Sequence, residues 1–227
     1  MGARTGLGLR VHTGWATAVV LRAASSPGAP PEVADRRRLE LADPAVPESK
    51  APYHEGLERK GARAEAAVER GCKAARAATL AAIRALVQEL TAAGLAPAAV
   101  ALVVGSDGDP SKIANPHVRA HASEGRLYRD VLEEAAEACG LDTLVLVEKE
   151  LWGQAEVALG PAPGPPFGPG GGGLKHIVTG MGASVGRPWR AEEKAATVAA
   201  WLALEGQRAG TLTTRSSSTH QAVSSRP

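Results

Sequence analysis

The sequence has few aromatic residues, few cysteines and no long apolar run. Aromatic residues make up 3% of the 227 residues, so the core must be built mainly from Ala, Leu and Val. Cys72 and Cys139 have no second cysteine nearby, which argues against a cysteine metal or redox pair and indicates reduced, buried thiols. No run approaches the roughly 18 apolar residues of a membrane span, and the first residues lack a signal-peptide pattern. We therefore expect a soluble, cytoplasmic protein with no membrane partner.

The sequence also has no large excess of positive or negative charge. The formal net charge is +2 and the pI is about 8.7, a balance too mild to favour nucleic acid or a membrane surface as partner. The length suits one domain with appendages. We predict a single domain over residues 1–205, with a flexible Pro/Gly-rich insert at 160–173, followed by a disordered Ser/Thr-rich tail at 206–227.

The first part of the chain has the pattern of three consecutive strands. These are predicted at 7–11, 15–23 and 32–41, from Val-rich and alternating stretches bounded by turn residues. A tight turn at His12, Thr13 and Gly14 joins the first two strands as a hairpin. The third strand carries three consecutive arginines, which favours an edge position because charged side chains discourage further strand pairing.

The remainder alternates helices with two apolar strands. Apolar residues at helical spacing predict a long helix over 62–93, and continuous apolar runs predict buried strands at 99–106 and 143–147. Further helices are predicted at 124–139, capped by Ser123, and at 148–159, 174–185 and 191–204. Strands that follow one another directly are antiparallel, whereas strands separated by helices are parallel with right-handed crossovers. The prediction is an α/β fold with a five-stranded mixed sheet and additional C-terminal helices.

This order of elements, over residues 7 to about 160, resembles the ribonuclease H-like fold. The stretch "RVHTGWATAVV" is similar to the first hairpin of bacterial Holliday-junction resolvases. Two other stretches, "HASEGRLYRDVLEEAAEACGL" and "GRPWRAEEKAATVAAWLAL", are similar to a family of bacterial proteins with no assigned activity.

The resemblance implies a nuclease whose first strand carries an acidic residue, because clustered carboxylates must hold divalent metal ions over the scissile phosphate. When the hairpin is aligned on Thr13 and Gly14, the aspartate of the resolvases falls at Leu7. No Asp or Glu precedes Glu32. We therefore expect the chain to lack the usual two-metal nuclease activity and to act as a binding or scaffold protein.

The polar residues that remain near the expected site are histidines and carboxylates. In this fold the carboxyl ends of the first and fourth strands are neighbours, and α/β proteins commonly bind ligands at such ends. The sequence therefore predicts a ligand site, for nucleic acid or a phosphorylated ligand, made by residues that follow three different strands: His12, His117, His121, Glu124 and Glu150.

A metal site is a sharper interpretation of the same region. Imidazole and carboxylate groups are ligands for a divalent ion such as zinc, manganese or magnesium, and the predicted set is His12, His54, His121 and Glu124. The alternative function is then a divergent metal-dependent nuclease or phosphatase that uses a His/Glu site. For each residue alone a structural role competes: a hairpin turn, a solvated loop, or an acid in the first turn of a helix.

A third hypothesis concerns the arginine run at Arg36, Arg37 and Arg38. These side chains could bind nucleic acid phosphates without sequence preference, which predicts salt-sensitive binding. The competing interpretation is a solvated face on an edge strand.

Overall fold

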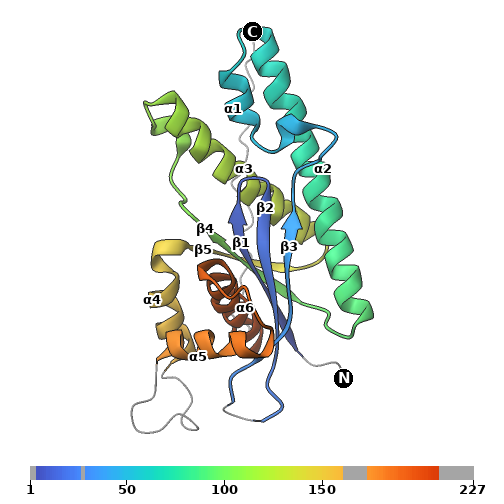
Figure 1. The fold of residues 1–227 in the computed structure, drawn as a ribbon, viewed down its shortest axis with the longest axis vertical. Coiled ribbons are helices and arrows are strands. Elements are labelled where there is room, and N and C mark those ends of the chain that lie inside the picture. The colour runs from blue at the N-terminus through green and yellow to red at the C-terminus, as the bar shows by residue number, and fades with distance from the viewer. Residues whose placement is uncertain (1–3, 27–28, 161–172, 210–227) are drawn as a thin grey trace, which may run out of the picture.

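Five strands form one mixed sheet in the order β3-β2-β1-β4-β5 in the computed structural model (Figure 1). The structure describes residues 4–26, 29–160 and 173–209. β1 (Thr5–His12), β2 (Trp15–Arg22) and β3 (Glu32–Glu40) are antiparallel neighbours, whereas β4 (Ala99–Val104) and β5 (Asp142–Val147) run parallel to β1. The predicted α/β class, mixed sheet and edge position of β3 are confirmed.

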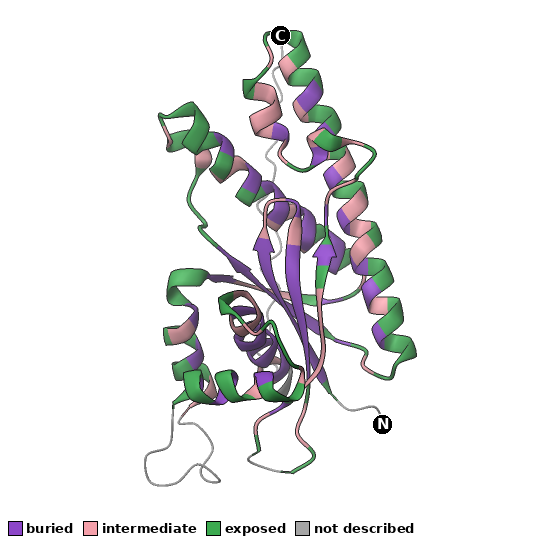
Figure 2. Ribbon diagram, viewed as in Figure 1, coloured by how far each residue is buried: buried purple, intermediate pink, exposed green. Residues whose placement is uncertain are grey.

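Helices cover both faces of this sheet. One face carries α1 (Pro52–Leu57), α2 (Ala62–Ala92) and α3 (Pro116–Ala138). The other carries α4 (Glu148–Leu159), α5 (Leu174–Met181) and α6 (Ala191–Ala209). Figure 2 shows that buried residues concentrate in the strands and in the helix stripes that face them. Each face therefore has its own hydrophobic core.

The side chains of β1 alternate between these two cores. Leu7, Leu9 and Val11 belong to the core beneath α2 and α3. Successive side chains of a strand point to opposite faces, so the even-numbered residues of β1 face α6. A Cβ atom added at Gly6 or Gly8 would lie 2.2 or 2.0 Å from backbone oxygens of Ala200 and Ala196. The two glycines therefore let the backbone of α6 lie directly on β1.

The alanine-rich face of α6 completes this close packing. Its buried residues include Ala195, Ala196, Ala199, Ala200 and Ala203, and none of these side chains extends beyond a methyl group. Along β1 from Gly6 to Gly8, the contacts on α6 move back one turn, from Ala200 to Ala196. The same step of one turn places Glu192 beside the end of β1. A backbone contact thus determines where an acidic side chain lies.

The structure differs from the predicted elements at two places, and both carry histidines of the predicted site. α3 begins at Pro116 rather than at Glu124, because the Asn115 side chain accepts hydrogen bonds from the backbone N–H groups of His117 and Val118, at 3.0 and 3.1 Å. A further helix, α1, begins at Pro52 and has no counterpart among the predicted elements. The result is a short helix that presents its side chains to α3.

The C-terminal helices differ from prediction only in length. α5 ends at Met181, before a 3-10 turn over Gly182–Ser184, and α6 continues to Ala209, beyond the boundary predicted at 205. Most of the predicted insert at 160–173 and of the predicted tail at 206–227 lies outside the described residues. Within the described part of the chain, none of the helices is long and apolar enough to cross a membrane.

Candidate functional site

The predicted site residues other than Glu150 fall into two clusters on opposite sides of the sheet. The Arg10 cluster, beneath α6, consists of Arg10, His12, Glu148 and Glu192. The histidine cluster, between α1 and α3, consists of His54, His117, His121 and Glu124. His12 faces α6 because it is an even-numbered residue of β1, so it lies apart from His121 and Glu124. The single convergent site expected from the sequence is therefore divided in two.

Arg10 is the centre of the first cluster. Its side chain is 11% exposed, and Nη2 donates to Glu148 Oε2 at 2.6 Å. Nη1 donates to the carbonyl oxygen of Val11 at 2.8 Å, and Nε lies 3.6 Å from Glu192 Oε2, too far for a hydrogen bond. One guanidinium therefore faces two carboxylates, from the first turns of α4 and α6.

His12 contributes to the same cluster from the end of β1. Its Nε2 lies 2.6 Å from Glu192 Oε2, and its ring stacks on Trp15 with centroids 4.0 Å apart. The guanidinium carbon of Arg38 lies 3.8 Å from the centre of the Trp15 ring. Cation–π and stacking contacts of this kind orient side chains at a partly exposed edge. The Arg10 cluster is thus continuous with an aromatic and basic surface at the hairpin.

The Arg10 cluster does not suit the divalent metal ions that the nuclease resemblance implies. Leu7 is fully buried in the core against α2 and α3, so the position aligned with the resolvase aspartate is hydrophobic. On the α6 side, where Glu148 and Glu192 meet, β1 supplies a guanidinium rather than a carboxylate. A dication would have to compete with this fixed positive charge for the same two carboxylates.

The histidine cluster joins residues far apart in the chain. α1 contributes His54, and α3 contributes His117 and His121, which are four residues apart and so share a helix face. The three ring centroids are 4.2 to 4.7 Å apart. One ligand atom from each histidine lies within 4.8 Å of the others. The start of α3 at Asn115 is what places both of its histidines on this face.

Glu124 holds His54 in a defined orientation. The carboxylate is 1% exposed, both of its oxygens lie 2.9 Å from His54 Nδ1, and Oε1 also accepts from the backbone N–H of His54 at 3.2 Å. A carboxylate accepts hydrogen bonds, so Nδ1 carries the proton. Nε2 of His54 is buried and has no hydrogen-bond partner. An unpaired buried polar group costs about 1–3 kcal/mol.

Two tyrosines support this cluster, of which Tyr128 is fully buried and Tyr53 is half-buried. Burial raises the pKa of Tyr53 to about 12, and it also raises the pKa of Tyr128. Both therefore stay protonated at neutral pH. The Tyr128 hydroxyl donates to the carbonyl oxygen of Ser49, which links the segment before α1 to α3. Burial likewise raises the pKa of the Cys72 thiol, next to Tyr53.

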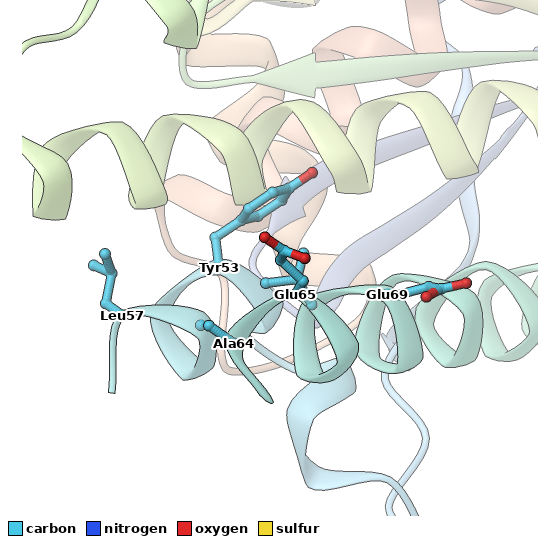
Figure 3. A pocket seen from close by; sticks show the side chains of 7 residues that line it. Tyr53, Leu57, Ala64, Glu65 and Glu69 are labelled. Atoms are coloured by element: carbon cyan, nitrogen blue, oxygen red, sulfur yellow. The ribbon is translucent and has the colours of Figure 1, made fainter. Parts of the chain in front are cut away.

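An open hollow of about 570 Å³ lies beside the histidine cluster, between α1 and α2. Figure 3 shows the Tyr53 side chain pointing from α1 towards α3, with Glu65 and Glu69 on α2. The remaining lining residues are Gly56, Leu57, Ala64 and Val68. None of the clustered histidines lines this hollow, so it is a separate, mainly apolar feature.

Glu150 belongs to neither cluster. It lies on α4, where it accepts a hydrogen bond from Gln154 at 3.2 Å and faces Lys149 at 3.8 Å. Two residues that the sequence did not single out, Arg10 and Glu192, are central to the first cluster. A signal for Glu192 was present, because acidic residues favour the first turn of a helix and "RAEEK" opens α6.

The arginine run on β3 has partners within the chain. Arg36 donates to the carbonyl oxygen of Pro188, and Arg37 pairs with Asp35 and Glu89. Arg38 pairs with Glu40 as well as lying over Trp15. These contacts reduce the free positive charge that the sequence displays at this edge.

Comparison with known proteins identifies the fold. No protein-family model matches the chain, and no curated protein matches it in sequence. Among solved structures, Thermus thermophilus RuvC matches at a TM-score of 0.53 with 10% identity, covering 92% of this chain and 98% of RuvC. T. thermophilus RuvC in complex with a Holliday junction substrate matches at 0.51 with 12% identity, covering 92% and 97%. The chain thus has the ribonuclease H-like fold, in the form found in the RuvC-type Holliday-junction resolvases.

Proposed function

We propose that this chain is a ribonuclease H-like binding protein that does not cleave phosphodiesters by the two-metal route. The observation that carries the proposal is the guanidinium of Arg10, 2.6 Å from Glu148 and 3.6 Å from Glu192 at the end of β1. Two-metal cleavage needs carboxylates free to coordinate ions on both sides of the reacting phosphate. Here the guanidinium occupies the space between the two carboxylates, where a metal ion would have to bind.

The experiment is a cleavage assay on labelled four-way junction, linear duplex and single-stranded DNA with Mg²⁺ or Mn²⁺. We expect no cleavage above a protein-free control. Glu148→Gln and Glu192→Gln remove the carboxylates of the Arg10 cluster, and Glu150→Gln is the matched control on α4. Metal-dependent cleavage that is lost in the first two variants and kept in the third would overturn the proposal.

Nucleic acid is the ligand that the fold and the hairpin surface favour. The resolvase of similar fold holds a Holliday junction, although at 12% identity the likeness extends to the fold alone. At the hairpin edge, Trp15 with His12 and Arg38 offers a ring and a cation of the kind that contact bases and phosphates.

Anisotropy of labelled junction, duplex and single-stranded DNA at two salt concentrations tests this ligand. We expect binding that weakens with salt and weakens further in Arg38→Gln. Arg84→Gln, an exposed arginine on α2, is the control. Binding that is absent at low salt, or equally weakened by both variants, would remove nucleic acid as the ligand.

A second candidate function is favoured by one observation, the three imidazoles of the histidine cluster. Metal-bound water at such a site could attack a phosphate ester, as in metal-dependent phosphatases or nucleases. Hydrolysis of p-nitrophenyl phosphate and its bis-ester with Zn²⁺ or Mn²⁺ tests this candidate. It requires activity that His121→Ala abolishes and Glu148→Gln leaves intact.

A further inference from the structure

We propose that His54, His117 and His121 bind one zinc ion, with Glu124 as the carboxylate that orients His54. The second candidate function above rests on this same site, whereas the zinc site itself stands whether or not the protein binds nucleic acid or hydrolyses a phosphate ester. It differs from the set expected from sequence, because His12 is replaced by His117 and Glu124 moves from a ligand to a support. Three features of the cluster support a zinc site: the protonation state of His54, the burial of its second ring nitrogen and the separation of the three rings.

The first step is the state of the His54 ring. Both Glu124 oxygens lie 2.9 Å from Nδ1, and the same carboxylate accepts the backbone N–H of His54. Metal-binding histidines commonly donate their second ring N–H to a carboxylate in this way, which fixes the tautomer and makes the other nitrogen a better donor to the metal. The arrangement therefore leaves Nε2 of His54 as the ligand atom.

The second step is the environment of that atom. Nε2 of His54 is buried and lacks any hydrogen-bond partner, while the His54 ring contacts the rings of His117 and His121. Buried polar groups in folded proteins are nearly always paired. A metal ion between the three rings supplies the missing partner. Neither of the other two histidines is buried, so an ion could reach the site from solvent.

The third step is distance. Zn–N bonds of about 2.0–2.1 Å in a tetrahedron separate ligand nitrogens by about 3.3 Å. One ring nitrogen from each of the three histidines lies within 4.8 Å of the others. His117 and His121 are exposed, so their rings can close the remaining gap by small side-chain rotations without moving α3. His54 is the fixed member and the two helix-face histidines adapt to it.

The ligand chemistry favours zinc. Three neutral imidazoles without a thiolate suit zinc, copper or nickel more than magnesium or calcium, which prefer oxygen ligands. Zinc accepts three histidines in a tetrahedral site whose fourth position remains open to water. The site would join α1, a helix of six residues, to α3. Such a short helix has little stability of its own, so a metal link across it has a measurable effect.

The experiment measures zinc content and affinity in the full chain. Protein stripped with a chelator is titrated with Zn²⁺ in competition with a chromophoric chelator, and with Co²⁺ to record the visible spectrum of a tetrahedral site. We expect one equivalent of zinc and a tetrahedral cobalt spectrum. His117→Ala and His121→Ala should each weaken zinc binding by at least about 100-fold, and Glu124→Gln by about 10–100-fold.

The control is His176→Ala, an exposed histidine on α5, which should bind zinc as the unaltered chain does. His12→Ala should also leave affinity unchanged, because His12 belongs to the Arg10 cluster. Circular dichroism confirms that each variant is folded. Failure to bind one equivalent, or unchanged affinity in folded His117→Ala and His121→Ala, overturns the proposal. Neither result depends on the nuclease or DNA-binding assays, and zinc binding without hydrolysis of p-nitrophenyl phosphate would remove the second candidate function while leaving the zinc site in place.

Discussion

The Arg10 cluster and the histidine cluster lie on opposite sides of one sheet, and each combines carboxylates with basic side chains. In the Arg10 cluster, Glu148 faces a guanidinium, and Glu192 lies between that guanidinium and His12, so each carboxylate has a basic partner from the chain itself. In the histidine cluster, Glu124 holds one imidazole whose other nitrogen is buried and unpaired. In the first arrangement the buried unpaired atom is Arg10 Nε, an N–H donor that faces a carboxylate of the chain, whereas in the second it is a ring nitrogen whose lone pair can bind a metal ion. The difference separates an internal ion-pair network from a site prepared for a ligand.

The largest expected effect on stability comes from a substitution that displaces α6, the helix on which Glu192 lies beside Arg10. Gly8→Ala would place a Cβ 2.0 Å from the backbone oxygen of Ala196. Because backbone rather than a flexible side chain must move, we expect a loss of about 3 kcal/mol or more in the free energy of unfolding. Urea unfolding measures it.

Gly153→Ala is the matched control for this change. Gly153 lies inside α4, and nothing lies within 4 Å of an added Cβ. Alanine is the better helix former, so this variant should gain about 0.5–1 kcal/mol. Equal stability of the two variants would show that α6 does not rest on β1 as closely as described.

The second prediction removes the cation of the Arg10 cluster. Arg10→Met leaves Glu148 without its guanidinium and Glu192 with only the His12 ring, 2.6 Å away. Removing one partner of a fully buried pair costs about 3–5 kcal/mol. The two carboxylates are 50% and 36% exposed, so we expect about 2 kcal/mol here, measured by urea unfolding.

A triple variant distinguishes charge from packing in this result. Arg10→Met combined with Glu148→Gln and Glu192→Gln removes all three charges and retains most of the volume. It should recover much of the lost stability, because uncompensated carboxylates are the main cost. If the triple variant is less stable than Arg10→Met alone, Arg10 acts through packing and the contrast between the clusters weakens.

The third prediction adds the missing partner to the histidine cluster. With free zinc tenfold above its dissociation constant, binding to the folded chain alone adds about 1.4 kcal/mol to the free energy of unfolding. Thermal unfolding with zinc and then with EDTA should show a reversible shift in Tm. His121→Ala should abolish the shift, while Arg10→Met should retain it. A shift of equal size in both variants would mean that zinc binds elsewhere.

The sequence predicts the fold because each strand carries its own signal. Helices cover both faces of β4, and its sequence is accordingly a continuous apolar run. The first hairpin is identified by its turn and by its Val-rich second strand. The edge position of β3 follows from its arginines. These are local patterns, and local patterns are what a single sequence records.

The grouping of the site residues is not local. The sequence alone groups His12 with His121 and Glu124 because all three follow strands. In the structure, side chains alternate between the two faces of β1, and the His12 side chain points to the face where Glu192 lies. The sequence pattern places His117 and His121 in a loop. In the structure Asn115 caps a helix whose first residue is Pro116, so both histidines lie on that helix. The contact of His54 with Glu124 depends on α1, which the turn-rich composition concealed.

The smallest expected effect tests how the histidine cluster is held in place before an ion binds. The buried Tyr128 hydroxyl donates to the carbonyl oxygen of Ser49, next to α1, so Tyr128→Phe removes one buried hydrogen bond while keeping the ring. We expect a loss of about 1 kcal/mol in the free energy of unfolding. Zinc affinity should fall less than in Glu124→Gln, because Glu124 contacts the His54 ring and Tyr128 does not. If Tyr128→Phe instead weakens zinc binding as much as Glu124→Gln, the position of α1 on α3, rather than the orientation of one imidazole, limits the affinity of the site.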